Sequence, residues 1–329
     1  MRTLRDAFWA IVALSLASQT APTAVLAQSM PDGSQPAACV GLNRDNPVPL
    51  DSRIGRPDPA IIEIFSGAGA SAISAHELTP QELTIVKRAL ARLPRLHRDV
   101  LQHHLRRLSF LDLQPGSGSA LTSRAGLDET RSQFDITLRA SLLDESLTAF
   151  LNTKEARLFE DDGSGFSVEF DAGQSDALAY ILLHEATHIV DQVLGLSEKA
   201  TGSFRADIWK DLRTLSEPHA SSLAARTPFR RAPAIPRRYS PAFYESLRKS
   251  PFVSFYASAA APEDLAELFA WQQLASRFNQ SLTLTVRDRE GFALYRYEPL
   301  KAPEVSLRFS EVQALLDRYE QHCGSVTKP

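Results

Sequence analysis

The sequence predicts an α+β fold, in which a small mixed sheet packs beside one long helix and further helices follow toward the C-terminus. Short apolar runs bounded by turn residues fill residues 109–170, as β-strands do, whereas helical spacing of apolar residues dominates from residue 175 onward. The length of 329 residues, 43% of them hydrophobic, is sufficient for one large core or two modest ones.

Residues 1–27 have the composition of a secretory signal peptide. Arg2 and Arg5 precede an apolar run over residues 7–17, and small residues lead up to a cleavage site after Ala27. The alternative is a membrane anchor, but the apolar run is shorter than the roughly 20 residues that a spanning helix needs. No later segment is long and apolar enough to span. We therefore expect an exported protein, periplasmic or secreted, without a membrane span after cleavage.

The charge of the chain is nearly balanced. Its net charge is −3, and removal of residues 1–27, which hold two Arg and one Asp, makes it −4. A protein that binds nucleic acid usually carries a basic excess, so we expect no nucleic-acid partner.

The two cysteines, Cys39 and Cys323, stand near the two ends of the mature chain. In an oxidising compartment, an even pair placed in this way predicts a disulfide bond between the termini. The alternative is two separate thiols, which exported chains seldom keep.

An extended arm and two helices come first in the mature chain. Residues 28–75 are expected to form the arm, because Pro, Gly, Ser and Asp are frequent there, and a single domain is expected over residues 76–329. The string TPQE at residues 79–82 supplies an N-cap, a Pro at the first helical position and a capping Glu, so it begins a helix that runs to about Leu93. A second amphipathic stretch covers residues 95–108. It carries three histidines that we expect to be solvated: His97, His103 and His104.

Four short apolar runs then predict β-strands: FLDL, FDITLRA, RLF and FSVEF. The last two are separated by the turn DDGSG and are expected to pair as a hairpin. These strands supply the sheet that is expected to pack beside the following helix.

A long helix follows the strands, capped by Ser175 or Asp176 and ended by Gly195. Its apolar residues recur at helical spacing, and its middle carries the string HEATH at residues 184–188. This helix is the one against which the sheet is expected to pack.

The C-terminal part begins with a long connection over residues 197–255. A third helix opens at Pro262 with the string PEDLAELFA. The final helix is expected to begin at Ser310, where Gln313 completes a capping box, and to reach about His322.

His184 and His188 are four residues apart on the long helix, so both imidazoles project from one face and can meet one metal ion. Zinc suits them, because a zinc ion with three protein ligands keeps a fourth position for water and lowers the pKa of that water to about 7. Glu185 stands beside the first ligand, where it can act as a general base. The alternative is a buried helix whose histidines only satisfy hydrogen bonds.

This segment resembles the active-site helix of the zincin metallopeptidases. The metzincin branch has Gly and His or Asp at fixed places after the second His, but this chain has Asp191 and Leu194 there. The chain is more similar to the gluzincin branch, with its thermolysin-like and lethal-factor-like members, which takes a third ligand from a Glu on a later helix. The string PEDLAELFA matches that element. It puts Glu263 at the ligand position and Glu267 at the position that holds a ligand His.

Alternatives for these acids stay open: Glu267 binds the metal while Glu263 faces water, or both are solvated surface acids. Tyr256 stands seven residues before Glu263, as a Tyr does in lethal-factor-like members, and its hydroxyl would stabilise an oxyanion. Otherwise it is a core aromatic. Asp191, one turn beyond His188, either accepts the second ring N–H of that His or is an exposed helix acid.

The resemblance implies a zinc metallopeptidase with one zinc per chain and a peptide or protein substrate. Two alternatives remain: a non-catalytic zinc-binding interaction protein on a zincin scaffold, and a zinc hydrolase of a non-peptide amide or ester. The connection 197–255 is longer than in thermolysin-like members and would form a lid or cleft wall. Its basic part, residues 226–249, either faces acidic substrates or is a solvated loop. By the same resemblance, FSVEF at residues 166–170 is the candidate strand edge for an extended peptide, the alternative being an internal strand.

Overall fold

The computed structural model describes residues 49–114, 118–125, 133–199 and 204–324. The predicted signal peptide, most of the predicted arm and Cys39 lie outside these ranges. Export and the Cys39–Cys323 bond therefore stay predictions, although Cys323 itself is buried on the last helix. Within the described ranges, no helix has both the length and the apolar character that crossing a membrane requires.

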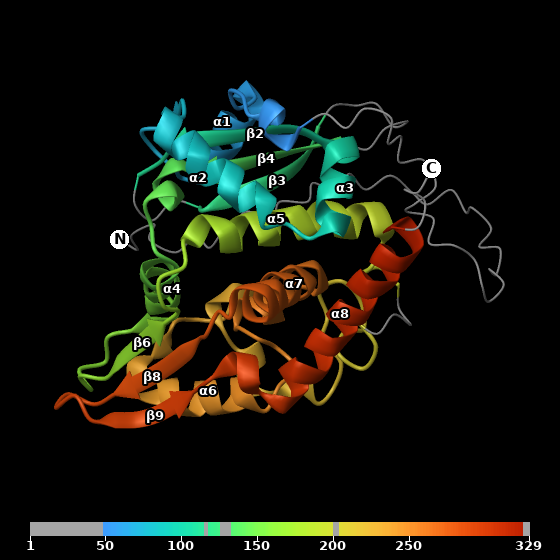
Figure 1. Ribbon diagram of the computed structural model, residues 1–329. Coiled ribbons are helices and arrows are strands. Elements are labelled where there is room, and N and C mark those ends of the chain that lie inside the picture. The colour runs from blue at the N-terminus through green and yellow to red at the C-terminus, as the bar shows by residue number, and fades with distance from the viewer. Residues whose placement is uncertain (1–48, 115–117, 126–132, 200–203, 325–329) are drawn as a thin grey trace.

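A four-stranded mixed sheet forms the upper half of the molecule in Figure 1. Its strands lie in the order β1-β2-β4-β3, with β2 parallel to β4 and the other two pairs antiparallel. This confirms the predicted α+β class with a small mixed sheet. The strands are β1 (Ser74–Ala75), β2 (Leu105–Asp112), β3 (Ala120–Ala125) and β4 (Gln133–Arg139).

Helices cover both faces of this sheet. On one face, Ile61 and Phe65 of α1 (Pro59–Gly67) pack against Leu111 and Leu121 of the sheet. The other face contributes to the main core, together with three helices: α2 (Pro80–Ala91), α3 (Arg95–His104) and α5 (Ala177–Leu194).

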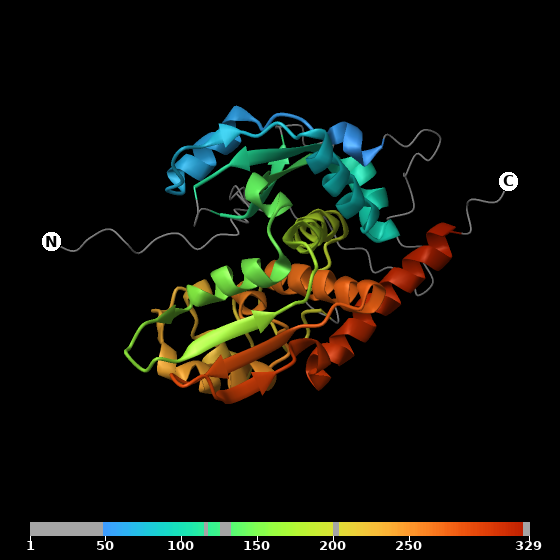
Figure 2. The same ribbon diagram turned by 60° about the vertical axis from the view of Figure 1, so that its left-hand side comes forward.

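Helix α5 runs through the centre of the molecule, between the sheet and helix α7 (Ala261–Phe278), as Figures 1 and 2 both show. Asp176 caps its N-terminus by accepting a hydrogen bond from the Ala179 N–H at 2.8 Å. Gly195 ends it in the left-handed conformation, with φ of 62°, which glycine adopts without steric cost. Both ends agree with the sequence prediction.

The lower half contains a second sheet and the C-terminal helices (Figure 2). Its three strands are antiparallel in the order β6-β8-β9. A short parallel pair joins β5 (Phe159–Glu160) to β7 (Ile235–Pro236). The remaining elements are β6 (Ser167–Asp171), β8 (Thr283–Arg287), β9 (Ala293–Tyr297), α4 (Leu147–Ala156), α6 (Ser240–Arg248) and α8 (Pro303–Gly324).

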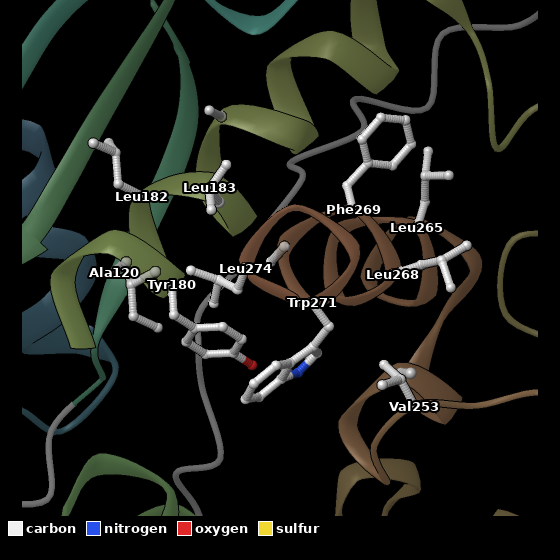
Figure 3. Close-up of a cluster of buried hydrophobic side chains, with 14 of the residues drawn as sticks. Ala120, Tyr180, Leu182, Leu183, Val253, Leu265, Leu268, Phe269, Trp271 and Leu274 are labelled. Carbon is white, nitrogen blue, oxygen red and sulfur yellow. The ribbon is translucent and has the colours of Figure 1, made fainter. Parts of the chain in front are cut away.

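One continuous hydrophobic core joins the two halves through the α5–α7 contact. In Figure 3, Tyr180 of α5 meets Trp271 of α7, and their ring centroids are 5.0 Å apart. Because α5 is apolar on nearly all sides, it can pack against the sheet and against α7 at once, and residues 177–191 are buried throughout.

Several local predictions were wrong. RLF and FSVEF do not form a hairpin, because β5 pairs with β7 and β6 pairs with β8. Local alternation indicates a strand but not its partner, and these partners come more than 70 residues later in the chain. Five further elements were not predicted from the sequence: α4, α6, β3, β8 and β9.

The ends of the fold differ from the prediction as well. Within the expected arm, residues 50–75 include α1 and the strand β1, which pairs with β2. The last helix begins at Pro303 rather than at Ser310, and Ser310 donates its hydroxyl to the Ser306 carbonyl inside the helix. His97, expected in solvent, is fully buried and contacts the Thr187 hydroxyl at 3.0 Å.

Candidate metal centre

Helices α5 and α7 bring three nitrogen and oxygen donors together. His184 and His188 lie one turn apart on α5, with their Nε2 atoms 3.2 Å apart. Glu263, in the first turn of α7, places its Oε2 3.1 Å from His184 Nε2 and 3.5 Å from His188 Nε2. Their side chains are buried. Among the described residues, this is the group whose donor atoms lie close enough together, within 4.8 Å, to hold a metal ion.

The spacing of the three donors fits a metal with short bonds. Zinc bonds to imidazole and carboxylate are about 2.0–2.2 Å long, so two ligands of a tetrahedral zinc ion lie about 3.3–3.5 Å apart. The three observed separations, 3.1 to 3.5 Å, are close to this range. The His-His-Glu group could therefore hold one metal ion, and it is consistent with a zincin-like site.

The ionisable groups of this centre shift one another's pKa values. Burial would raise the pKa of Glu263, but the charge of His188 and the hydrogen bond from His184 outweigh it and lower that pKa below the usual range. Burial would lower the pKa of His184, but hydrogen bonds with Glu263 and Glu267 raise it to about 9. In the metal-free protein the group therefore holds protons that a metal ion must displace.

Glu267 lies behind His184, on the side away from Glu263. Its Oε1 is 3.2 Å from His184 Nδ1 and accepts a hydrogen bond from the Tyr180 hydroxyl, while its Oε2 accepts one from Ser254 at 2.6 Å. Glu263 therefore faces Nε2 of His184, and Glu267 faces Nδ1. Neither acid is solvated, so that alternative was wrong.

Glu185 is fully buried, and its carboxylate is hydrogen-bonded by a residue of the upper sheet. Its Oε2 accepts a hydrogen bond of 2.6 Å from the hydroxyl of Thr122 on β3, whereas its Oε1 has no partner among the described residues. An unpaired buried carboxylate oxygen is costly and rare in native proteins, which makes it a candidate for a functional group. Thr122 was not predicted as a site residue, because β3 itself was not predicted.

Tyr256 comes from a short 3₁₀-helix, residues Tyr256–Ala259, directly before α7. Its ring centroid is 5.9 Å from that of His184, and the edge of Phe229 packs on it at 5.1 Å. Burial raises the pKa of Tyr256 well above its usual value, and the negative charges of Glu263 and Glu185 raise it further. The structure thus places a protonated phenol beside the donor group.

Asp191 is neither an exposed acid nor a partner of His188. It is buried, and its two carboxylate oxygens accept hydrogen bonds from Ser197, from the backbone N–H at 2.7 Å and from the hydroxyl at 2.6 Å. The residue therefore closes the turn after α5. Its one-turn spacing from His188 was a misleading signal, since the chain turns back at Gly195 and supplies nearer donors.

Much of the basic part of the connection, residues 226–249, is bound by the protein itself. Arg230 donates to the carbonyls of Ser258 and Ala259, at the junction between the Tyr256 segment and α7. Arg238 pairs with Asp162. Two more members, Arg248 and Lys249, pair with Glu245. These four therefore do not form a free basic wall.

FSVEF is an edge strand, as predicted, but in the lower sheet, where most of it forms β6. One of the two edge strands of the upper sheet is β3, and its Thr122 touches Glu185. A peptide that pairs with a strand edge beside the donor group would therefore use β3.

Comparisons with protein-family models, curated proteins and solved structures found no match to this chain. Its likeness to the zincins therefore depends on the motif and on the geometry of the donor group.

Proposed function

We propose that the protein is a zinc metallopeptidase in which His184, His188 and Glu263 hold one zinc ion. One observation carries the proposal: two imidazoles and a carboxylate converge at 3.1 to 3.5 Å, next to a buried glutamate with one unpaired oxygen. A structural site would bring four protein ligands, whereas three ligands leave a position for a reactant.

A bound zinc ion would polarise a carbonyl and lower the pKa of a water to about 7. Oε1 of Glu185 accepts the proton of the attacking water and later delivers it to the leaving amine. Thr122 holds the other oxygen, so the carboxylate keeps one orientation during both transfers. The hydroxyl of Tyr256, which burial keeps protonated, donates a hydrogen bond to the carbonyl oxygen as negative charge develops there.

Two features favour catalysis on peptides over the alternatives. A scaffold kept for binding alone has no need of a buried carboxylate with an unpaired oxygen, because that oxygen costs stability. The edge of β3, next to Glu185, offers backbone N–H and C=O groups that an extended peptide can pair with. A small ester or amide has no row of backbone groups to pair with them. Export to the periplasm or medium, as the sequence of residues 1–27 predicts, is part of the proposal.

Metal analysis of the purified protein tests the ligand assignment. We expect about one zinc per chain in the parent and loss of that zinc in His184→Ala and His188→Ala, because each removes one of three ligands. His103→Ala, a partly exposed histidine of α3, is the matched control and should keep its zinc. Full zinc occupancy in both ligand variants would contradict the site.

A further inference from the structure

Lys154 of α4 places a largely buried ammonium group behind the candidate metal centre. Its side chain is 11% exposed, and its Nζ lies 3.8 Å from Glu267 Oε1. The same Nζ lies over the ring of Tyr256, 4.3 Å from the centroid. One side chain therefore contacts both the acid behind His184 and the tyrosine beside it.

The charges around the centre make this ammonium significant. Glu185, Glu263, Glu267 and Glu155 are all buried within the same region of α4, α5 and α7. Among the described residues, no other lysine or arginine forms an ion pair with any of these four acids. Buried carboxylates without a counter-charge become protonated or destabilise the fold. Lys154 is thus the cation that compensates Glu267.

The position of Glu267 matters because of what it holds. Its Oε1 lies 3.2 Å from His184 Nδ1 and 3.8 Å from Lys154 Nζ. A carboxylate held at Nδ1 orients the imidazole ring, so that Nε2 faces the donor group. Lys154 contacts the same oxygen and can therefore fix the place of the carboxylate behind His184.

We propose that Lys154 is a positioning residue of the metal centre, which sets the metal affinity by holding the Glu267 carboxylate against His184 and the Tyr256 ring in place. The inference rests on the proposed function in one respect only, that the centre binds a metal. A simple packing role makes a different prediction. Aromatic rings surround the Nζ, with Tyr180 at 5.9 Å and Phe229 at 6.0 Å, so a methionine of similar length would pack there equally well.

The test compares zinc affinities of purified apo-proteins by competition with a chromophoric chelator. Lys154→Met keeps the length of the side chain and removes its charge, and we expect its zinc dissociation constant to rise about 10- to 100-fold. The visible spectrum of the cobalt-substituted protein should change as well, because the orientation of His184 changes. Lys87→Met, an exposed lysine paired with Asp51, is the matched control and should leave both readouts unchanged.

A double-mutant cycle tests the route through Glu267. Glu267→Gln removes the acid's charge, so adding Lys154→Met to that variant should change the zinc affinity by less than about threefold. This comparison also avoids an uncompensated buried carboxylate at Glu267, which could impair folding of the single Lys154→Met variant.

The outcomes separate this inference from the proposed function. Parent-like zinc affinity in Lys154→Met overturns the positioning role. Equal effects of Lys154→Met in the parent and in the Glu267→Gln background overturn the route through Glu267. Failure of the parent itself to bind zinc overturns the proposed function, and the inference with it.

Discussion

Glu155 is a buried carboxyl next to Lys154, and its environment makes it sensitive to pH. Burial raises its pKa to about 7, although the charge of Lys154 and the hydrogen bond from the Tyr244 hydroxyl, 3.0 Å long, lower it. In the folded protein the group is therefore protonated over a pH range in which the unfolded chain, with an ordinary glutamate pKa, has released the proton.

This difference predicts how stability depends on pH. The folded state binds more protons than the unfolded state between about pH 4.5 and about pH 7, so the contribution of Glu155 is complete below that window and is lost as the pH rises through it. The loss is on the order of 3 kcal/mol for a shift of this size. Glu155→Gln has a neutral side chain at every pH, so its unfolding free energy should lack this pH-dependent contribution.

Urea unfolding of the parent and of Glu155→Gln at about pH 5 and about pH 8 measures this contribution to the unfolding free energy. Both proteins should be metal-free. The parent should lose more stability than the variant between the two conditions. The same loss in both proteins would show that Glu155 titrates normally.

The residues of the centre differ in how far the sequence could identify them. His184, Glu185 and His188 belong to one string, and helical spacing alone places both imidazoles on one face. Glu263 was predicted from the resemblance of PEDLAELFA to the second element of the gluzincins. Thr122 and Lys154 were not found, because their contacts depend on how β3 and α4 pack against α5 and α7.

At the scale of elements, the first turn of α7 is fixed by a buried ion pair with α8. Arg308 donates to both carboxylate oxygens of Asp264, at 2.8 and 2.9 Å, and Trp209 donates to one of them at 2.9 Å. Asp264 directly follows Glu263. This network therefore holds in place the turn of α7 that carries the carboxylate of the candidate centre.

Removal of one partner should destabilise the protein strongly. Asp264→Asn leaves the Arg308 guanidinium buried without its counter-charge, which typically costs about 3–5 kcal/mol. Glu77→Gln, in the exposed Arg56–Glu77 pair, is the control and should change the unfolding free energy little. Denaturant unfolding compares the two variants, and equal stabilities would mean that the buried pair contributes nothing.

Elements with strong local signals were predictable from the sequence, and those without them were not. The capping box at Thr79 and Glu82 forms as predicted, and α5 has the predicted cap and stop. The strand β3 has the sequence ALTSRA, which lacks a clear alternation, and its pairing with β4 depends on contacts across the sheet. Helix α4 was not predicted, although its sequence carries a capping residue, Ser146.

At the scale of the whole molecule, the candidate centre lies between the two halves. The upper sheet supplies Thr122, α5 supplies the histidines and Glu185, and the lower half supplies Glu263, Tyr256 and the supporting Lys154. One core runs through both halves, and these groups have little exposed surface. Such burial strengthens electrostatic interactions at a reacting centre.

The overall class was predictable, since the sequence contains both strand-like and helical hydrophobic periodicity. The presence of a second sheet was not. Its strands β6 and β8 are separated by more than 110 residues, and nothing in a local window indicates that they pair. The site lies where the two sheets and their helices meet, so its surroundings could be described only from the fold.

The peptidase proposal is tested most directly by Glu185→Gln, assayed on a peptide library with the zinc content measured in parallel. The glutamine keeps the size of the side chain and can still accept the hydrogen bond from Thr122, but it cannot take up a proton. Zinc content and unfolding temperature should match those of the parent, while hydrolysis should fall by at least about 100-fold. Glu63→Gln, an exposed glutamate of α1, is the matched control and should cleave normally. A Glu185→Gln protein that holds the same zinc and cleaves as fast as the parent would contradict the proposed mechanism.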